Sequence, residues 1–216
     1  MFNPSYIGPR EDILRLVPRG VKRVLDVGCS VGTLGQALRE RDGAEVTGIE
    51  LDAQMGAEAR ERLNEVHIGS VEEKALFERL GDRTFDCIVF ADLLEHLADP
   101  WIALGRFVER LAPEGVVVAS LPNIRHYTTI RTLLFQGYWP YRDRGIHDQT
   151  HLRFFTLRNI RELFASVGLS ILELDRNYRI IERPHRLNRF APALALPGLR
   201  EFLAFQYLVR AGRKRS

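Results

Sequence analysis

The residues whose types and spacing best suit chemistry form a glycine-rich run, Asp26-Val27-Gly28-Cys29-Ser30-Val31-Gly32, directly after a β-branched stretch. Glycine lets a backbone turn sharply and lets a ligand approach without meeting a Cβ atom. The run departs from the dinucleotide fingerprint G-x-G-x-x-G, because Ser30 stands where the second glycine belongs. It does match the nucleophile elbow G-x-S-x-G, but hydrolases with that elbow have several strands and an oxyanion loop before the serine, and only a short segment precedes Ser30.

A third interpretation makes the same run a nucleoside-binding loop with an acid in front of it. Asp26 stands at the end of the first expected strand, where its carboxylate can accept hydrogen bonds from a cationic ligand with an amino-acid tail. Glu50 ends the next β-branched run, eighteen residues beyond Gly32, and is placed to hold two ribose hydroxyls. Such a ligand carries no phosphate, so the loop needs neither a P-loop lysine nor the third fingerprint glycine.

Two further clusters carry acids and histidines. Asp92, Glu95 and His96 have i, i+3, i+4 spacing, which places them on one face of a helical turn. They could orient a substrate and supply a base through His96, they could be purely structural, or they could help bind a divalent metal with His126 or His147. We assign no metal ligand from three residues alone. The second cluster, 147–151, carries His147 and His151 around Asp148, and either histidine could act as a base or simply anchor the loop.

The elements that must position these residues alternate between strand and helix signals. Strands are expected at 21–27, 45–50, 66–68, 85–90 and 115–120, with helices at 32–41, 53–63, 71–80 and 100–111. The regular pattern stops after Pro122, and 123–153 is rich in aromatic residues, histidine and arginine, as in a lid or substrate wall. A helix at 157–167 and strands at 169–174 and 202–209 follow, with a proline-rich insertion at 184–197.

This order predicts an α/β fold with a doubly wound, seven-stranded, mostly parallel sheet, a lid insertion after strand 5 and an insertion before the last strand. We expect a single domain over 1–216, with a cofactor-binding core at about 20–122, an acceptor and lid region at about 123–155, and a C-terminal helix, strands and basic tail at 156–216. The length of 216 residues suits one such domain.

Composition narrows the class of protein further. The two cysteines, Cys29 and Cys87, both lie in apolar sequence, which argues against a disulfide framework and for a reducing compartment. No run of 18 apolar residues is present, and the first residues lack the layout of a signal peptide, so a cytoplasmic protein is expected.

Four segments together resemble the class I S-adenosylmethionine-dependent methyltransferases, in particular the subgroup of ubiquinone-biosynthesis O-methyltransferases. They are the glycine loop, Val46-Thr47-Gly48-Ile49-Glu50, the run 85–97 that ends in Glu95-His96-Leu97, and His151-Leu152-Arg153-Phe154-Phe155-Thr156. The resemblance implies S-adenosylmethionine as cofactor and S-adenosylhomocysteine as product. The cofactor-binding residues that it implies are Asp26, Gly28, Cys29, Ser30, Gly32, Glu50, Leu51, Ser70, Val71, Phe90, Ala91 and Asp92. Ser70 departs from the acid that the family usually has there, and Ser30 from a smaller residue.

The acceptor side is less determined. The candidate bases are His96, His147 and His151, and the candidate substrate-binding residues are Tyr6, Asn123, His126, Tyr127, Tyr138 and Arg153. Three segments resemble bacterial methyltransferases encoded near cell-surface glycan genes: Leu121-Pro122-Asn123, Tyr138-Trp139-Pro140-Tyr141-Arg142-Asp143 and the His-Asp-x-Thr-His run at 147–151. This resemblance implies transfer to an oxygen of a small-molecule, sugar or lipid-linked glycan acceptor. A metal-assisted RNA 2′-O-methyltransferase and a non-catalytic S-adenosylmethionine-binding regulator stay open as alternatives.

The net charge of +3 comes entirely from the C-terminal segment. Residues 176–216 hold ten basic residues and two acidic ones, so the rest of the chain is slightly acidic. Leucines and Phe190 interleave with arginines between 186 and 200, as a peripheral membrane contact would require, although prolines break a continuous helix and a lid or homodimer contact is the other interpretation. No nucleic-acid-binding module is recognisable, so a nucleic-acid partner is not expected.

Overall fold

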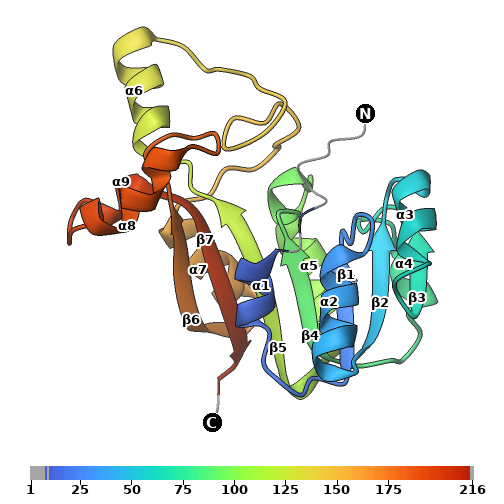
Figure 1. Ribbon diagram of the computed structural model, residues 1–216. Coiled ribbons are helices and arrows are strands. Elements are labelled where there is room, and N and C mark those ends of the chain that lie inside the picture. The colour runs from blue at the N-terminus through green and yellow to red at the C-terminus, as the bar shows by residue number, and fades with distance from the viewer. Residues whose placement is uncertain (1–7, 9, 215–216) are drawn as a thin grey trace.

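The computed structural model describes residue 8 and residues 10–214, and a twisted seven-stranded sheet forms its centre (Figure 1). The strand order is β3-β2-β1-β4-β5-β7-β6. The strands are β1 (Arg23–Val27), β2 (Glu45–Glu50), β3 (Glu65–Ile68), β4 (Phe85–Ala91), β5 (Leu111–Pro122), β6 (Leu169–Tyr178) and β7 (Ala204–Arg213). The predicted seven-stranded, mostly parallel sheet is therefore confirmed.

The direction of the strands determines where a ligand can bind. Strands β1 to β5 pair in parallel, whereas β7 is antiparallel to both β5 and β6. The carboxyl ends of β1, β2, β4, β5 and β6 consequently meet at one edge of the sheet, the upper edge in Figure 1. In open α/β sheets ligands bind outside this carboxyl edge, close to the point where the strand order reverses, here between β1 and β4.

Helices cover both faces of the sheet, as the apolar strands require. The helices α1 (Glu11–Leu16), α2 (Thr33–Asp42) and α3 (Ala53–Ala59) lie against one face, where Ile13, Leu38 and Ala59 join one buried cluster. The helices α4 (Lys74–Arg79), α5 (Pro100–Val108) and α7 (Leu157–Ser166) lie against the other face and supply Leu76, Phe107 and Leu163 to a second cluster.

Alternation along the central strands divides the core between these faces. In β4, Ile88 and Phe90 belong to one cluster while Cys87 and Val89 belong to the other, because successive side chains point to opposite sides of a strand. Both cysteines are free and buried, and both belong to the same cluster.

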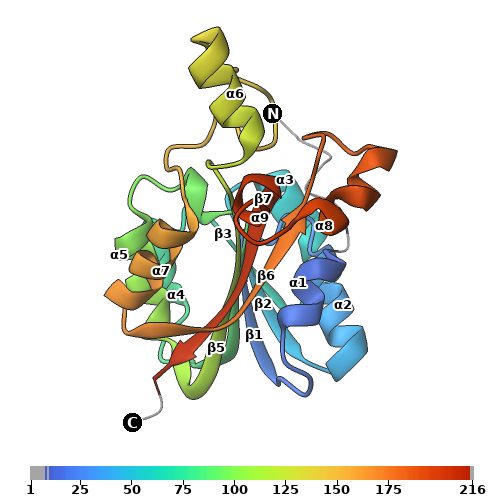
Figure 2. The ribbon, with the colours of Figure 1, turned by 90° about the vertical axis from the view of Figure 1, so that its left-hand side faces the viewer.

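Two excursions leave the carboxyl edge. The first, 123–156, contains α6 (Tyr127–Gln136), which stands clear of the sheet in both views (Figures 1 and 2). The second, 179–203, joins the end of β6 to the start of β7 through a 3₁₀ helix, η3 (Arg186–Phe190), and the short helices α8 (Ala191–Leu194) and α9 (Arg200–Leu203). Both insertions were predicted as irregular segments, so their helices are new, as is α1. No helix within the described ranges is long and apolar enough to cross a membrane.

Candidate active site

The glycine loop follows β1 at the carboxyl edge and is shaped by three residues with positive φ. These are Gly28 (φ 80°), Ser30 (φ 51°) and Gly32 (φ 79°). The amides of Gly28 and Cys29 both donate to the carbonyl of Ile49 in β2, at 2.8 and 2.9 Å. A Cβ at position 28 would lie 3.2 Å from Cδ1 of Leu93, so the bare backbone there is needed for the close approach of neighbouring groups.

Glu50 holds the loop in this shape from the end of β2. Its Oε2 accepts from the Ser30 amide at 2.8 Å, and its Oε1 accepts from the Asp52 amide at 2.9 Å. The first bond stabilises the left-handed conformation at Ser30, which costs a non-glycine residue free energy. The Ser30 hydroxyl points to Sδ of Met55 at 3.8 Å, and no described histidine bonds to it, so the nucleophile-elbow interpretation is wrong.

Asp26 lies beneath the loop and lacks a partner for part of its carboxylate. The residue is 2% exposed, and its Oδ2 is buried with no hydrogen-bond partner among the described residues. Burial, reinforced by the charge of Glu50, raises the pKa of Asp26 to about 7. A buried acceptor left open in this way fits a cationic group of a bound ligand better than it fits a structural role.

The other predicted cofactor-binding residues divide into two groups. Leu51 is exposed beside Glu50, while Ser70 and Val71 follow β3, with Val71 packed into the core. The side chains of Cys29 and Phe90 point elsewhere. Sγ of Cys29 packs against Gly48, where a Cβ would come within 2.6 Å of it, and Phe90 is fully buried against Phe107. Only the backbone of these two residues can therefore face a ligand at the loop, which corrects the predicted lining.

Asp92, after β4, is the centre of a polar cluster drawn from four segments. It adopts φ 54°, and its Oδ1 accepts from the Ser120 hydroxyl at 2.8 Å and from the Gln206 amide. Its Oδ2 accepts from Nη1 of Arg10 at 2.6 Å. Burial alone would lower the pKa of Arg10, but the carboxylates of Asp92 and Asp12 outweigh burial and raise it. Nothing in the sequence singles out Arg10, Ser120 or Gln206, because these residues meet only through the folded sheet.

Glu95, His96 and His151 form the second polar group at this edge. Each offers one atom that could bind a metal, and these atoms lie within 4.8 Å of one another. Glu95 lies in the 3₁₀ helix η2 (Leu94–His96) and is 1% exposed, with its Oε2 unpartnered among the described residues. Burial, followed by the charge of Asp92, raises the pKa of Glu95 well above its ordinary value.

The hydrogen bonds of the two histidines indicate which ring nitrogen carries the proton. The Thr150 hydroxyl donates to Asp148 at 2.6 Å, so it accepts from Nδ1 of His96 at 3.0 Å. Nδ1 of His151 faces the carbonyl of Ile146 at 3.2 Å, and a carbonyl can only accept. Nε2 of both rings is thus left with a free lone pair.

Burial also keeps these histidines neutral. It lowers the pKa of His96, and it lowers the pKa of His151 to about 4, where the neighbouring His96 adds to the shift. The rings contact each other edge to face, with centroids 4.7 Å apart. His96 and His151 are therefore the predicted bases that the structure brings together.

Other predicted site residues have structural roles instead. His147 is fully buried, with its ring nitrogens facing Thr129 at 3.1 Å and Glu182 at 3.2 Å, so it anchors α6 and is not an available base. His126 caps α6, and its nitrogens face Thr128 and the carbonyl of Arg179.

Asn123 is likewise fully buried. Its side-chain amide donates to the carbonyls of Glu201 and Ala204, both at 2.7 Å. The roles predicted for His147, His126 and Asn123 are corrected for the same reason: their polar atoms are already bonded.

The remaining predicted substrate residues are spread over the first excursion. The Tyr127 hydroxyl donates to the carbonyl of Ile180, and Tyr138 is exposed on the loop after α6. Arg153 donates to the carbonyl of Ala98 and lies against η2. Tyr6 lies outside the described residues.

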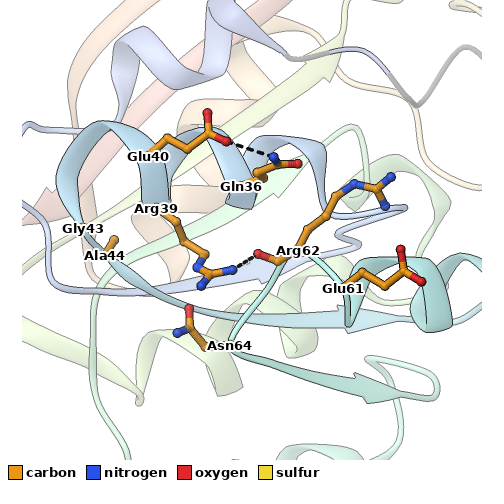
Figure 3. Close-up of a pocket in the computed structure, with 8 residues that line it drawn as sticks. All are labelled: Gln36, Arg39, Glu40, Gly43, Ala44, Glu61, Arg62 and Asn64. Carbon is orange, nitrogen blue, oxygen red and sulfur yellow. Dashed lines mark hydrogen bonds between the residues drawn. The ribbon is translucent and has the colours of Figure 1, made fainter.

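A pocket elsewhere on the molecule is not part of this group. It lies beside α2 and the turn before β3, near the amino ends of the strands (Figure 3). Within it, Gln36 donates to Glu40 at 2.9 Å and Arg39 donates to the carbonyl of Arg62. These polar groups bond to one another and converge on no common point.

A family model described as a methyltransferase domain matches residues 8–174, and the match includes both the glycine loop and the histidine pair. The chain belongs to the S-adenosylmethionine-dependent methyltransferases. A ubiquinone biosynthesis O-methyltransferase of Alkalilimnicola ehrlichii is 30% identical over 171 residues, which are 74% of this chain and 69% of that protein. The relative from Psychrobacter arcticus is also 30% identical, over 69% of this chain and 59% of its own length.

Solved structures agree on the fold. A methyltransferase of Archaeoglobus fulgidus aligns with a TM-score of 0.65 at 17% identity, over 96% of both chains. The magnesium protoporphyrin IX methyltransferase of Synechocystis, solved with bound S-adenosylhomocysteine, aligns with a TM-score of 0.63 at 15% identity, over 97% of this chain and 84% of that one. The predicted class I methyltransferase fold is confirmed.

The loop of this methyltransferase fits its cofactor. S-adenosylmethionine carries an ammonium group, which the open carboxylate of Asp26 can neutralise, and a ribose, whose hydroxyls can reach the remaining lone pairs of Glu50. Ser70 offers a hydroxyl in place of the usual acid, and already accepts from the Glu72 amide at 3.3 Å. The methyl group would then face the cluster around Asp92.

Proposed function

We propose that this methyltransferase transfers the methyl group to an oxygen of a small-molecule, sugar or lipid-linked glycan acceptor. The observation that carries the proposal is the neutral pair His96 and His151, each with a free Nε2 lone pair, at the carboxyl edge of the sheet that also carries the glycine loop. A hydroxyl must lose a proton when it is methylated, and a positioned imidazole can take it. The relatives named as O-methyltransferases support the same class of acceptor atom.

The chain's own residues contribute alignment and a proton acceptor. The sulfonium supplies an activated methyl group, so holding the acceptor oxygen in line with it accounts for most of the acceleration. In the transfer, the oxygen–carbon bond forms while the carbon–sulfur bond breaks, and the hydroxyl proton moves to Nε2 of His96. Before the transfer, the Thr150 hydroxyl accepts a hydrogen bond from Nδ1–H of His96. The ring proton therefore stays on Nδ1, and Nε2 is unprotonated.

Asp92, paired with Arg10, lies close enough to the histidine pair for its charge to oppose, in part, the lowering of the pKa of both rings by burial. The ion pair of Asp92 and Arg10, with Ser120 and Gln206, fixes the chain after β4 in a left-handed conformation. That conformation directs the polypeptide into η2, and η2 carries Glu95 and His96. The cluster therefore sets the distance between the cofactor loop and the base.

The test is transfer of a labelled methyl group. The protein is incubated with S-adenosylmethionine carrying a ¹³C-methyl group and, separately, with phenols, glycans, lipid extract and RNA, and the products are analysed by mass spectrometry. We expect label on an oxygen of a small molecule, glycan or lipid. Label on RNA would favour the 2′-O-methyltransferase alternative, and S-adenosylhomocysteine binding without any labelled product would favour the regulator.

A second candidate is metal-assisted transfer at the same place, favoured by one potential ligand atom from each of Glu95, His96 and His151 within 4.8 Å of one another, and by the unpartnered Oε2 of Glu95. One carboxylate and two imidazoles suit Zn²⁺, Mn²⁺ or Fe²⁺. A bound cation would lower the pKa of an acceptor hydroxyl. Thr150 and the carbonyl of Ile146 already orient the rings as partners of metal ligands commonly do.

Calorimetric titration of the chelator-treated protein with Mn²⁺ and Zn²⁺ separates the two candidates. A saturable site that the Glu95→Gln variant lacks would support the metal version. If no site is found and activity is insensitive to chelator, the histidine alone acts as the base.

A further inference from the structure

The two excursions at the carboxyl edge expose large apolar side chains that no described element covers. On the first, Leu134 and Phe135 in α6 are 70% and 78% exposed. On the second, Leu196 and Leu199 are more than half exposed, and the exposed Leu187, Phe190 and Leu194 precede them. Single exposed apolar residues are ordinary, but two neighbouring segments that each carry several indicate an interaction surface.

The charged residues within α6 and within residues 183–200 are all arginines. No acidic residue occurs between Ile124 and Arg142, or between Arg183 and Arg200. Those stretches contain exposed arginines at 125, 131 and 142 on the first excursion, and at 183, 186, 189 and 200 on the second. Arg142 and Arg200 pair with Glu182 and Glu201, so the remaining five carry the positive charge. Arginine with interleaved leucine and phenylalanine is the composition of segments that lie in a lipid interface.

Contacts at their bases join the two excursions into one surface. The guanidinium of Arg125 stacks over the ring of Phe202, with 4.6 Å to the centroid. His126 faces the carbonyl of Arg179 at 2.9 Å, and Tyr127 donates to the carbonyl of Ile180. The start of α6 is thereby fixed to the segment that leaves β6, and Figures 1 and 2 place α6 and α8 at the same end of the sheet.

We propose that this face, formed by α6 and residues 183–200, docks on a membrane surface that contains anionic lipid. Anionic headgroups complement the arginines, while the leucines and phenylalanines insert at the headgroup boundary. A second copy of the chain is a poorer occupant, because a symmetric dimer would bring two arginine-rich surfaces together. The inference is independent of which acceptor is methylated.

Docking by this face would fix the orientation of the site relative to the membrane. Both excursions leave the edge where β4, β5 and β6 end, and that edge carries Asp92 and the histidine pair. A protein docked by this face would turn its acceptor side toward the lipid. A lipid-linked acceptor could then reach the site without leaving the membrane.

Vesicle co-sedimentation of the full chain tests the proposal. Binding is measured on phosphatidylcholine vesicles alone and with increasing phosphatidylglycerol, at low and high salt. We expect binding that rises with phosphatidylglycerol and falls with salt. The variants Leu134→Ser/Phe135→Ser and Arg186→Gln/Arg189→Gln should each weaken partition roughly tenfold or more.

Matched controls remove the same groups from the opposite end of the sheet. Leu172→Ser alters a leucine that is also exposed, near the start of β6, and Arg19→Gln/Lys22→Gln removes two charges before β1. Both should bind vesicles as the unaltered protein does, and S-adenosylhomocysteine binding reports that every variant is folded. Equal pelleting on neutral and anionic vesicles overturns the proposal. So does a dimer, detected by sedimentation, that the same variants dissociate while vesicle binding is absent.

Discussion

The two halves of the carboxyl edge are built in different ways. On the cofactor half, Gly28, Ser30 and Glu50 come from two consecutive strands, and most of their bonds are to backbone amides and carbonyls. On the acceptor half, Arg10, Asp92, Ser120 and Gln206 come from four segments up to 196 positions apart, and side chains make most of the bonds. The cofactor half is built from residues close together in sequence, whereas the acceptor half forms only when the whole sheet is assembled.

This difference separates binding from chemistry. A loop whose shape is set mainly by nearby backbone hydrogen bonds can bind the same cofactor even when distant residues change. A cluster assembled from remote segments is altered by a single substitution in any one of them, including Ser120 in β5 and Gln206 in β7. Damage to the cofactor half should therefore abolish binding, whereas damage to the acceptor half should leave binding and reduce the rate.

The largest effect on cofactor binding is expected from Gly28→Val. Valine disfavours φ 80°, and its Cβ would lie 3.2 Å from Leu93, so the loop cannot keep its shape. Backbone strain of about 1–3 kcal/mol, together with the displaced amides, should weaken S-adenosylhomocysteine binding by roughly a hundredfold or more. Isothermal titration calorimetry measures this directly.

Gly43→Val is the matched control. Gly43 also has a positive φ, 64°, but a Cβ there meets nothing within 4 Å, and it lies at the opposite edge before β2. The control should lose stability and keep its affinity for the ligand. If both variants bind equally well, the glycine loop is not the cofactor site.

The acceptor half should respond differently, with His96→Asn as the clearest case. Loss of a general base costs roughly 10²–10⁴ in rate. Affinity for S-adenosylhomocysteine should be unchanged, since His96 contacts no loop residue in the described bonds. His147→Asn, at a histidine with both nitrogens bonded inside the fold, should instead lower the melting temperature.

The pH profile sharpens this prediction. Burial lowers the pKa of His96, so the neutral, proton-accepting form persists below the ordinary histidine value of about 6.5. The rate should stay level as pH falls through that value and decline only at lower pH. The rate is measured at saturating S-adenosylmethionine, so that protonation of Asp26 does not limit binding. A rate that already halves near pH 6.5 under this condition would contradict the assignment of His96 as the base.

The sequence predicts the cofactor half of the site well and the acceptor half poorly. The glycine loop and Glu50 can be identified from the sequence because they are separated by one helix and one strand. That separation places them at the carboxyl ends of two neighbouring parallel strands. The cluster at Asp92 could not be found, since nothing in the chain relates Arg10 to Gln206 until β7 is inserted between β5 and β6. The only available signal was Arg10-Glu11-Asp12, a charged run that also reads as the start of a helix.

The histidines show a further limit. Composition identified six titratable rings but could not tell a ring with a free nitrogen from one bonded on both sides. His126 and His151 lie in equally polar sequence, yet one caps α6 and the other faces His96. The irregular run 123–153 concealed α6 because its exposed face carries Leu133, Leu134 and Phe135, against the usual pattern of a surface helix.

Asp26→Asn tests whether the cofactor half is built for binding at the expense of stability. The pKa of Asp26 is raised to about 7, against about 3.9 in an unfolded chain. Between those values the unfolded chain releases the proton and the folded one keeps it, so the carboxyl group destabilises the fold as pH rises. Asparagine removes this effect, and the unliganded variant should be more stable at pH 8, by roughly 2–4 kcal/mol.

The same substitution should weaken cofactor binding by about tenfold to a hundredfold, because the ammonium group loses its counter-charge. Chemical denaturation at pH 5 and pH 8, with and without S-adenosylhomocysteine, measures both effects. Asp52→Asn, which keeps its capping oxygen for the amides of Gln54 and Met55, is the control. A variant that is less stable at pH 8 would show that Asp26 has a structural partner.

The smallest effect is expected from Thr150→Val, which keeps the shape of the side chain and removes its hydroxyl. Thr150 does not touch the reacting atoms in the proposed mechanism; it positions His96 by occupying Nδ1, with Asp148 behind it. Without it the proton can move to Nε2, and the rate should fall about tenfold, as losses of such supporting bonds typically do. The Michaelis constant for S-adenosylmethionine should not change, and ¹⁵N NMR of the ring should show a mixture of tautomers where the unaltered protein shows one.

Thr84→Val, which removes a hydroxyl bonded to Arg23 at the amino edge, should alter neither the Michaelis constant nor the tautomer of His96. A single unchanged tautomer in Thr150→Val would mean that another group orients His96, and the acceptor half would then be less dependent on distant contacts than its bonds indicate.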